Sequence, residues 1–392
     1  MVKYWLLFIK LLIVGVASSQ SSKCDIEELK NSRQYFSLYK CLEEADPLNT
    51  DVELVLQKVD LALDYYTSSY YHRAFGYTNL REGERLEDIR QTTEASNDFS
   101  FNVDSVLLKL IDTYPNDYRL HLGLGKYYKQ VFLLFGDRWG RKSEWLLEQS
   151  KYYLTEAYRN GVYDSYSLYV LGYYNTIVEN YHDARYWYQK SIQLKDDALC
   201  NYNLAIACLF DGAFVDGLLP AKRAYELFQD SLKKGDAARI TGIMLSKREQ
   251  HEDALFYFEQ ANSLSPSYKP NQLYLLRTFL KLNREVESYD LALEILEKEV
   301  YKPDVLEEYL ELFEQEDAIA LLRKVFDATL VAFENDDEAV GNILFHFAKL
   351  EFRQGKKKKC KRYLKQSKER FSNVFDEGHQ VFQALDQMLN HL

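Results

Sequence analysis

Small and large apolar residues recur along the middle of the chain at a spacing that fits helical hairpins. Ser150, Ala184, Gly217, Ala254 and Ala292 are separated by 34, 33, 37 and 38 residues. Four positions after each of them except Gly217 comes a large apolar residue, and seven positions after comes a residue that is small in most segments. Small residues at i and i+7 let two antiparallel helices approach closely, and the bulky residue fills the gap to the next hairpin. The pattern predicts an all-α array of stacked hairpins.

These positions resemble the tetratricopeptide repeat (TPR), a 34-residue helix-turn-helix unit with Leu-Gly and Tyr on its first helix and Ala, Phe, Ala, Pro on its second. The matching residues are Leu124, Gly125, Tyr128, Leu171, Gly172, Leu204 and Ala205 on first helices, and Ala254, Phe258, Ala261 and Pro266 on a second helix. The best units are 165–197, 198–231 and 235–266. Pro220 lies inside an expected second helix, so we expect that helix to start late or to kink. The resemblance implies a right-handed helical solenoid.

The solenoid is expected to cover 101–392, preceded by an irregular helical region over 20–100 that has helical patterning but no repeat register. Gly125 and Ser150 are 25 residues apart, where the motif gives 12. The sequence therefore predicts an insertion over 133–145.

Composition and the N-terminus favour an all-helical, exported chain. Of 392 residues, 47% are hydrophobic, 6 are Pro and 16 are Gly, and a many-stranded fold needs more turn residues. Lys3, the apolar run WLLFIKLLIVGV and the small residues ASSQ predict a signal peptide over 1–19 and a periplasmic or extracellular location. The run is shorter than the roughly 20 apolar residues that span a bilayer. Because Lys10 interrupts it, a buried N-terminal helix is the alternative.

The five cysteines form no CxxC pair, which disfavours zinc-ribbon and thioredoxin-type chemistry. Cys24 and Cys41 can pair in an oxidising compartment if the helix between them is broken near Asn31 and Ser32. The sequence leaves that disulfide open.

Known catalytic and metal-binding motifs are absent from the sequence. HExxH, GxSxG and a strand-associated GxGxxG do not occur, and no histidine has a second His or Cys at a metal-ligand spacing. We therefore expect no catalysis, no cofactor and no metal. The net charge of −11 disfavours general nucleic-acid binding. The less favoured alternative is an enzyme with unrecognised carboxylates, which two carboxylates buried in one apolar cleft would support.

Tyrosine is abundant, at 32 of 392 residues. The resemblance implies that the inner face of the solenoid is lined by fixed positions of each first helix. The groove residues expected from these positions are Tyr166, Tyr169, Tyr173, Tyr202, Asn203 and Phe210. Tyr offers a broad face and a hydroxyl at a low entropic cost, which suits an extended peptide or a sugar chain. The alternative is that these rings pack against the insertion or the N-terminal helices.

The 133–145 insertion contains Arg138, Trp139 and Arg141. Trp and Arg lead the residue types that dominate binding energy at interfaces, and loops on a rigid scaffold often carry binding residues. These three residues are therefore candidate partner contacts. The alternative is a capping loop whose Trp139 plugs the end of the solenoid.

Charge is strongly polarised near the C-terminus. Residues 284–338 carry 18 acidic and 5 basic side chains, whereas residues 353–370 carry 10 basic and 1 acidic. The candidate patch for an anionic partner consists of Lys356, Lys357, Lys358, Lys359, Lys361 and Arg362. A membrane surface, an anionic glycan or an acidic protein would fit it. The alternatives are pairing with the acidic stretch, or simple solvated helix faces.

Together these features favour an exported, non-catalytic scaffold that captures a protein or peptide in a Tyr-lined groove. Glycan binding by the same tyrosines is the alternative. The sequence does not identify the partner.

Overall fold

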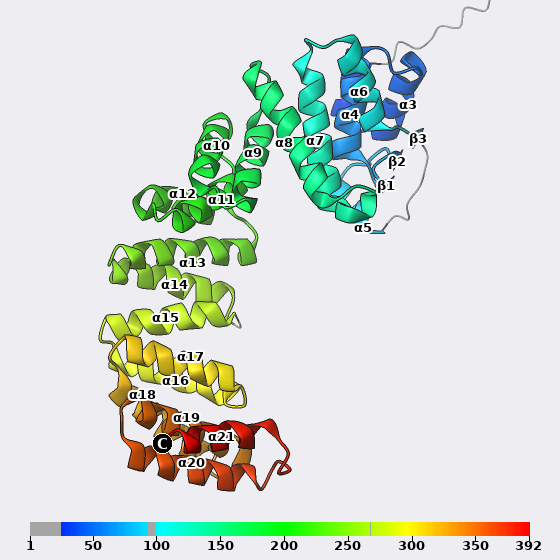
Figure 1. Cartoon of the computed structure of the whole chain (residues 1–392). Coiled ribbons are helices and arrows are strands. Elements are labelled where there is room, and N and C mark those ends of the chain that lie inside the picture. The colour runs from blue at the N-terminus through cyan, green and yellow to red at the C-terminus, as the bar shows by residue number, and fades with distance from the viewer. Residues whose placement is uncertain (1–24, 93–98, 267) are drawn as a thin grey trace, which may run out of the picture. The chain divides into compact units, whose positions relative to one another are not determined.

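The computed structural model describes residues 25–92, 99–266 and 268–392. They form two compact units that divide between Leu194 and Lys195 (Figure 1). The expected signal peptide over 1–19 lies outside the described residues. Within the described residues, no helix is long and apolar enough to cross a membrane.

Unit 1 consists of helices and one small sheet. Its elements are α2 (Ile26–Asn31), α3 (Tyr35–Ala45), α4 (Val52–Asp60), the π-helical turn η1 (Leu61–Tyr65), β1 (Ser68–Tyr70), β2 (Ala74–Gly76), α5 (Leu86–Thr92), β3 (Phe99–Ser100), α6 (Val103–Thr113), α7 (Tyr118–Leu134), the 3-10 turn η2 (Gly136–Trp139), α8 (Ser143–Arg159), α9 (Ser165–Ile177) and α10 (Tyr181–Leu194).

The sheet is a departure from the helical region that the sequence predicts over 20–100. Strand β2 lies between β1 and β3, and both pairs are antiparallel. The turn from β1 to β2 contains Tyr71 and His72, which both have positive φ angles, of 44° and 54°. Left-handed backbone of this kind ends a helical pattern and reverses the chain. The aromatic residues around the turn also favour strands.

The core of unit 1 joins this N-terminal region to α7. The buried His72 ring lies among the rings of Tyr66, Phe75, Tyr127 and Phe135, with centroids 5.0–6.1 Å away. The Tyr127 hydroxyl donates a 2.9 Å hydrogen bond to the His72 carbonyl. Burial lowers the pKa of His72 to about 4, so the imidazole is neutral at pH 7. The N-terminal region and α7 therefore share one hydrophobic core.

The hairpins pack as the small and large residues predict. A Cβ on Gly172 of α9 would lie 2.6 Å from the ring of Tyr188 on α10, so only glycine allows this approach. A Cβ on Gly125 of α7 would lie 2.6 Å from the Leu154 side chain on α8. The Ser191 hydroxyl of α10 donates a 2.7 Å hydrogen bond to the Ser165 carbonyl of α9. These contacts fix the two helices of each hairpin against each other.

Unit 2 continues as helical hairpins. Its elements are α11 (Ala198–Phe210), α12 (Phe214–Leu227), α13 (Ser231–Lys247), α14 (His251–Leu264), α15 (Lys269–Lys281), α16 (Glu285–Glu299), α17 (Pro303–Gln315), α18 (Ile319–Ala332), α19 (Asp337–Arg353), α20 (Lys357–Phe371) and α21 (Gln380–Asn390). Helix α12 starts at Phe214 and continues through Pro220, so the expected late start does not occur.

Helices α13 to α20 lie in successive layers, as Figure 1 shows from yellow-green to orange-red. Tyr309, Phe313, Phe326 and Phe347 are fully or almost fully buried in the core between α15 and α19. Beyond this core, Phe382 and Leu385 of α21 pack on buried residues of α19 and α20. Helix α21 therefore covers the apolar surface of the last hairpin, α19 and α20.

The oxidation state of the cysteines tests the prediction that the protein folds in an oxidising compartment. Cys200, Cys208 and Cys360 are buried and are not in disulfides, whereas Cys41 is disulfide-bonded. Cys24, the partner that the sequence suggests, lies outside the described residues. We predict that a thiol reagent modifies none of the five cysteines in the folded protein and only three in denaturant. Modification of all five without a reductant would show that the disulfide does not form.

Candidate functional site

Helix α9 begins at a capping box that fixes which face it presents. The Ser167 backbone N–H donates a 2.8 Å hydrogen bond to the Asp164 carboxylate, and the Asp164 backbone N–H donates one of 2.9 Å to the Ser167 hydroxyl. These reciprocal bonds satisfy donors that a helix start leaves unpaired. From this fixed start, Tyr166, Tyr169 and Tyr173 follow at i, i+3 and i+7 and share one face of the helix.

The three rings form a continuous row, called the tyrosine row below. The ring centroids of Tyr166 and Tyr169 are 6.2 Å apart and those of Tyr169 and Tyr173 are 6.4 Å apart, with interplanar angles of 25° and 29°. Tyr166 is 40% exposed, and the other two rings are half-buried. The rings are therefore accessible on one side and supported on the other.

Acidic groups surround the Tyr166 end of the row. Lys126 of α7 forms an ion pair with Asp164. Near this pair, partial enclosure raises the pKa of the Asp60 and Asp64 carboxyls above their ordinary value. The same enclosure, with the nearby charges of Asp64 and Asp164, raises the pKa of Tyr166 to about 12. Its phenol therefore keeps its proton and can donate a hydrogen bond at neutral pH.

Lys129 of α7 lies under the other end of the row. Its side chain is 1% exposed, and Nζ is 3.2 Å from the centroid of the Tyr173 ring and 4.9 Å from that of Phe132. Among the described residues, Nζ has no hydrogen-bond acceptor. Burial lowers the pKa of this amine to about 7. Two ring faces thus provide its electrostatic partners.

The N-terminal helices occupy part of the inner face of α7. Val59 and Leu56 of α4 lie against Gly123, within 3.7 Å of where its Cβ would be. The Gln130 side-chain amide donates a 2.6 Å hydrogen bond to the Leu63 carbonyl of η1. The N-terminal helices therefore pack against residues of α7. The sequence offers such packing as an alternative for the tyrosines of α9.

Tyr202, Asn203 and Phe210 lie on α11 in unit 2, so the groove expected over 166–210 crosses the division between the units. Tyr202 is half-buried and its ring is 6.1 Å from that of Phe228. Asn203 is half-buried, and Phe210 is 63% exposed. The tyrosine row is the part of the expected groove that lies within unit 1.

The 133–145 segment, expected as an exposed loop, is mostly helical, and most of its residues are exposed although Trp139 is buried. Helix α7 extends to Leu134, η2 follows, and α8 begins at Ser143. Trp139 is 6% exposed, its indole N–H donates a 2.8 Å hydrogen bond to the Tyr71 carbonyl, and the Arg73 guanidinium lies 4.4 Å above its ring. Trp139 therefore anchors the sheet turn and is not an exposed partner contact.

The two arginines beside Trp139 remain at the surface. Arg138 donates a 2.9 Å hydrogen bond to the Leu134 carbonyl, and Arg141 lies 5.2 Å from the centroid of the Trp145 ring. Both side chains are exposed. They remain candidate contacts without the tryptophan that was expected between them.

The basic patch lies at the start of α20. Lys356, Lys357, Lys358, Lys359, Lys361 and Arg362 are all exposed. Lys356 contacts the Gln354 side chain at 2.7 Å, and Lys357 contacts the Leu392 carbonyl at 3.0 Å. The charges of the patch are thus largely presented to solvent.

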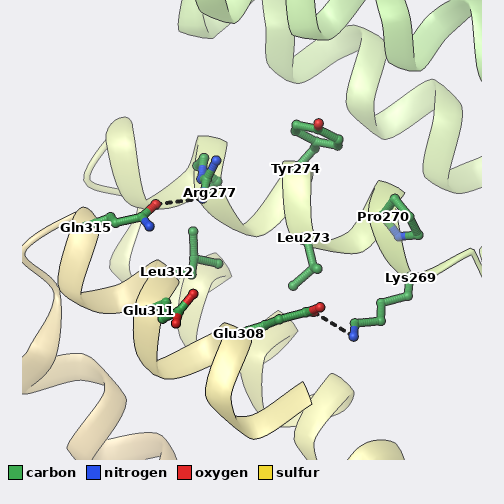
Figure 2. Close-up of a pocket in the computed structure, with 9 residues that line it drawn as sticks. All are labelled: Lys269, Pro270, Leu273, Tyr274, Arg277, Glu308, Glu311, Leu312 and Gln315. Atoms are coloured by element: carbon green, nitrogen blue, oxygen red, sulfur yellow. Dashed lines mark hydrogen bonds and ion pairs between the residues drawn. The ribbon is translucent and has the colours of Figure 1, made fainter. Parts of the chain in front are cut away.

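Unit 2 has a pocket that the sequence analysis did not identify (Figure 2). It has a volume of about 450 Å³ and lies between α15 and α17. An ion pair of 2.6 Å between Lys269 and Glu308 bounds one end, and a 3.0 Å hydrogen bond from Arg277 to Gln315 bounds the other. Leu273 lies between them in the pocket lining. The pocket can hold an apolar group flanked by polar ones.

The repeat register contains a signal for this pocket. In the repeat unit formed by α15 and α16, Ala292 is the small residue of the second helix. Counting back from Ala292 places Tyr274 and Arg277 at inner-face positions of the first helix, α15, and both residues line the pocket. The same register applied beyond residue 231 would have found it.

Comparisons with known proteins give similarities of fold only. No family model matches the chain, and no curated protein matches it. Among solved structures, the apo form of RapI is 11% identical over 89% of this chain and 97% of its own, with a TM-score of 0.44. YrrB, described as a TPR protein with an unusual peptide-binding site, is 14% identical over 59% of this chain and 96% of its own, with a TM-score of 0.40. MamA from Desulfovibrio magneticus RS-1 is 17% identical over 44% of this chain and 93% of its own, with a TM-score of 0.38.

At these scores the similarities carry no argument about function. The architecture rests on the chain itself, in which the helices of antiparallel hairpins pack through small residues against large ones, as Gly172 does against Tyr188 and Gly242 against Phe258. By this packing the described residues form an all-α array of antiparallel helical hairpins, the fold that the resemblance to the tetratricopeptide repeat implies.

Proposed function

We propose that this protein is an exported, non-catalytic interaction scaffold, and that its tyrosine row captures an extended segment of a partner protein. The ring spacing of 6.2–6.4 Å carries the proposal. An extended chain rises about 3.3 Å per residue, so side chains on one of its faces repeat about every 6.6 Å. Alternate side chains of a bound peptide can therefore contact successive rings.

The charges near the row are of both signs. Asp64 and Asp164 lie near Tyr166, whereas Lys126 pairs with Asp164 and the charges of Lys30 and Arg90 act on Asp64. Asp60 and Asp64 are only partly enclosed and stay exposed to solvent, so they do not form the buried carboxylate pair that would support an enzyme.

Export is supported by two observations. The apolar N-terminal run is typical of a signal peptide, and Cys41 is disulfide-bonded, as expected in an oxidising compartment. The protein would then meet its partner outside the cytosol.

A peptide library selected on the protein starting at Gln20, followed by affinity measurements, tests the proposal. The triple variant Tyr166→Ala/Tyr169→Ala/Tyr173→Ala should weaken binding of the selected peptides by on the order of 10- to 100-fold, because aromatic anchors dominate such interfaces. The matched control is Tyr114→Ala/Tyr152→Ala/Tyr163→Ala, which removes three exposed tyrosines elsewhere in unit 1. The control should bind as the wild type does.

Equal binding by the triple variant and the control would show that the row is not the site. If the triple variant has a lowered melting temperature, the single variant Tyr166→Ala replaces it in the test. This substitution removes only the most exposed ring of the row, and weaker peptide binding by it would support the row as the site. The same rings could instead stack on sugar rings. A glycan that binds the wild type and loses affinity in Tyr166→Ala, with no peptide selected, would establish the glycan function in place of peptide capture.

A further inference from the structure

Helix α20 presents a cationic face opposite the stripe that anchors it. The buried stripe consists of Cys360, Leu364, Ser367 and Phe371. At 100° per residue, Lys358, Arg362 and Lys365 lie on the opposite side of the helix and Lys361 lies on its flank, about 90° from the stripe, and all four are exposed. Lys358 and Lys365 are seven residues apart, so these cations follow the helix for about 10 Å.

The acidic stretch of the chain does not neutralise this face. Among the described residues, Lys358, Lys361 and Lys365 form no ion pair, and the ion pairs of α20 come from Lys368 with Asp386 and from Arg370 with Asp337. These two pairs lie in the last turns of the helix.

Acidic residues of 284–338 have partners on other helices. Glu285 pairs with Lys324, Glu308 with Lys269, and Glu307 with Lys349 and Arg353. Pairing between the acidic stretch and the basic face, one of the explanations that the sequence offers, therefore does not occur at Lys358, Lys361 or Lys365.

We propose that this face of α20 docks the protein on an anionic lipid bilayer. Clusters of lysines on a helix bind anionic headgroups through summed electrostatic attraction. Lysine is a compact, flexible charge that tolerates mobile headgroups, whereas planar bidentate recognition favours arginine. Three of the four cations on the face are lysines. The whole chain has a net charge of −11 although this helix is basic. The remainder of the chain is therefore acidic and is repelled by such a surface, so the protein would bind with α20 toward it.

One ring lies beside this face, because the Arg362 guanidinium is 4.9 Å from the centroid of the Tyr363 ring. Tyr363 of α20 is stacked on Phe347 inside the unit, with centroids 5.1 Å apart and an interplanar angle of 13°. Binding to single-stranded nucleic acid relies on exposed rings between cations, and sugar rings also stack on exposed aromatic faces. Glu369 lies on the same face one turn after Lys365 and limits the cationic surface at that end.

Co-sedimentation with lipid vesicles tests the proposal. The full chain should bind phosphatidylcholine vesicles that contain about 30% phosphatidylglycerol and not vesicles of phosphatidylcholine alone. Raising the salt concentration to about 0.5 M should release it. The variant Lys358→Glu/Lys361→Glu/Lys365→Glu should bind the anionic vesicles more weakly by on the order of 100-fold or more.

A charge-matched control separates a docking face from net charge. Lys195→Glu/Lys233→Glu/Lys247→Glu makes the same change in charge at exposed lysines elsewhere in unit 2, and it should keep most of the binding. Equal loss in both variants, or no binding of the wild type to anionic vesicles, would overturn the proposal. A third result would also overturn the proposal: the wild type binds heparin, and the α20 variant loses heparin binding but binds vesicles as the wild type does. The face would then bind a linear polyanion and not a bilayer.

Discussion

Replacing Lys129 by methionine is expected to stabilise the protein by about 1–3 kcal/mol near pH 6. The amine is 1% exposed, has no hydrogen-bond acceptor among the described residues, and has a pKa lowered by burial to about 7. The faces of Tyr173 and Phe132 offset part of the cost of its charge. Methionine keeps much of the shape of the side chain and removes the charge.

The gain should depend on pH in a defined direction. In the unfolded chain the pKa of this lysine is near its ordinary value of 10.5. Between about pH 7 and that value, the unfolded state binds a proton that the folded state lacks, so the free energy of unfolding of the wild type rises with pH. Below about pH 7 both states are protonated and the full cost of the buried charge remains. The advantage of Lys129→Met should therefore be largest near pH 6 and should shrink toward pH 10.

Lys58 provides the matched control, because it is also fully buried but has partners. Its Nζ donates hydrogen bonds to Glu43, the Asp46 carbonyl and Asn49 at 2.7, 2.9 and 2.8 Å. Lys58→Met leaves these acceptors without their donor and should destabilise the protein by about 2–4 kcal/mol. Calorimetric measurement of the melting temperature of both variants across the pH range tests the two predictions. If Lys129→Met also lowered the melting temperature near pH 6, the idea of an uncompensated buried amine would be wrong.

Gly125→Ala should destabilise unit 1 by about 1–3 kcal/mol. A Cβ at this position would lie 2.6 Å from Leu154 Cγ and 3.0 Å from the Leu154 backbone nitrogen. The side chain could change its rotamer, but the backbone atom can be relieved only if α8 moves away from α7. The cost should exceed the gain of about 1 kcal/mol that alanine brings to a helix interior.

Gly123, two residues earlier on α7, separates the clash from helix propensity. A Cβ there would lie 3.6–3.7 Å from Val59, Leu107 and Leu56, which is ordinary van der Waals contact. Gly123→Ala should therefore stabilise the protein by up to about 1 kcal/mol. Urea unfolding followed by circular dichroism compares the two variants. Equal midpoints would mean that the helices are not held together at Gly125 as the structure shows.

The sequence predicts the hairpins well because their determinants are local. Gly172 and Tyr188 meet across one tight turn, and their sizes decide how closely α9 approaches α10. The row of Tyr166, Tyr169 and Tyr173 follows from helical periodicity once the helix start is known. Features of this kind involve residues that are less than one repeat apart.

Features that depend on distant parts of the chain were either missed, as for Lys129, or left as an alternative, as for the packing of Trp139. The burial of Trp139 depends on Tyr71 and Arg73, and the burial of Lys129 depends on a ring 44 positions later in the sequence. No local pattern distinguishes Lys129 from the solvated lysines of α20. Side-chain type alone therefore indicates an exposed charge where the fold buries one.

The contact between the sheet turn and α7 has a consequence for the order of folding. The bond from Tyr127 to His72 closes 55 residues of chain and that from Trp139 to Tyr71 closes 68, whereas the hairpin bond from Ser191 to Ser165 closes 26. Long closures slow folding because chain entropy is lost before the contacts form. A chain delivered from its N-terminus leaves the aromatic surroundings of His72 open until Tyr127 and Phe135 have emerged. That interval is when unit 1 is most exposed to aggregation and to proteases.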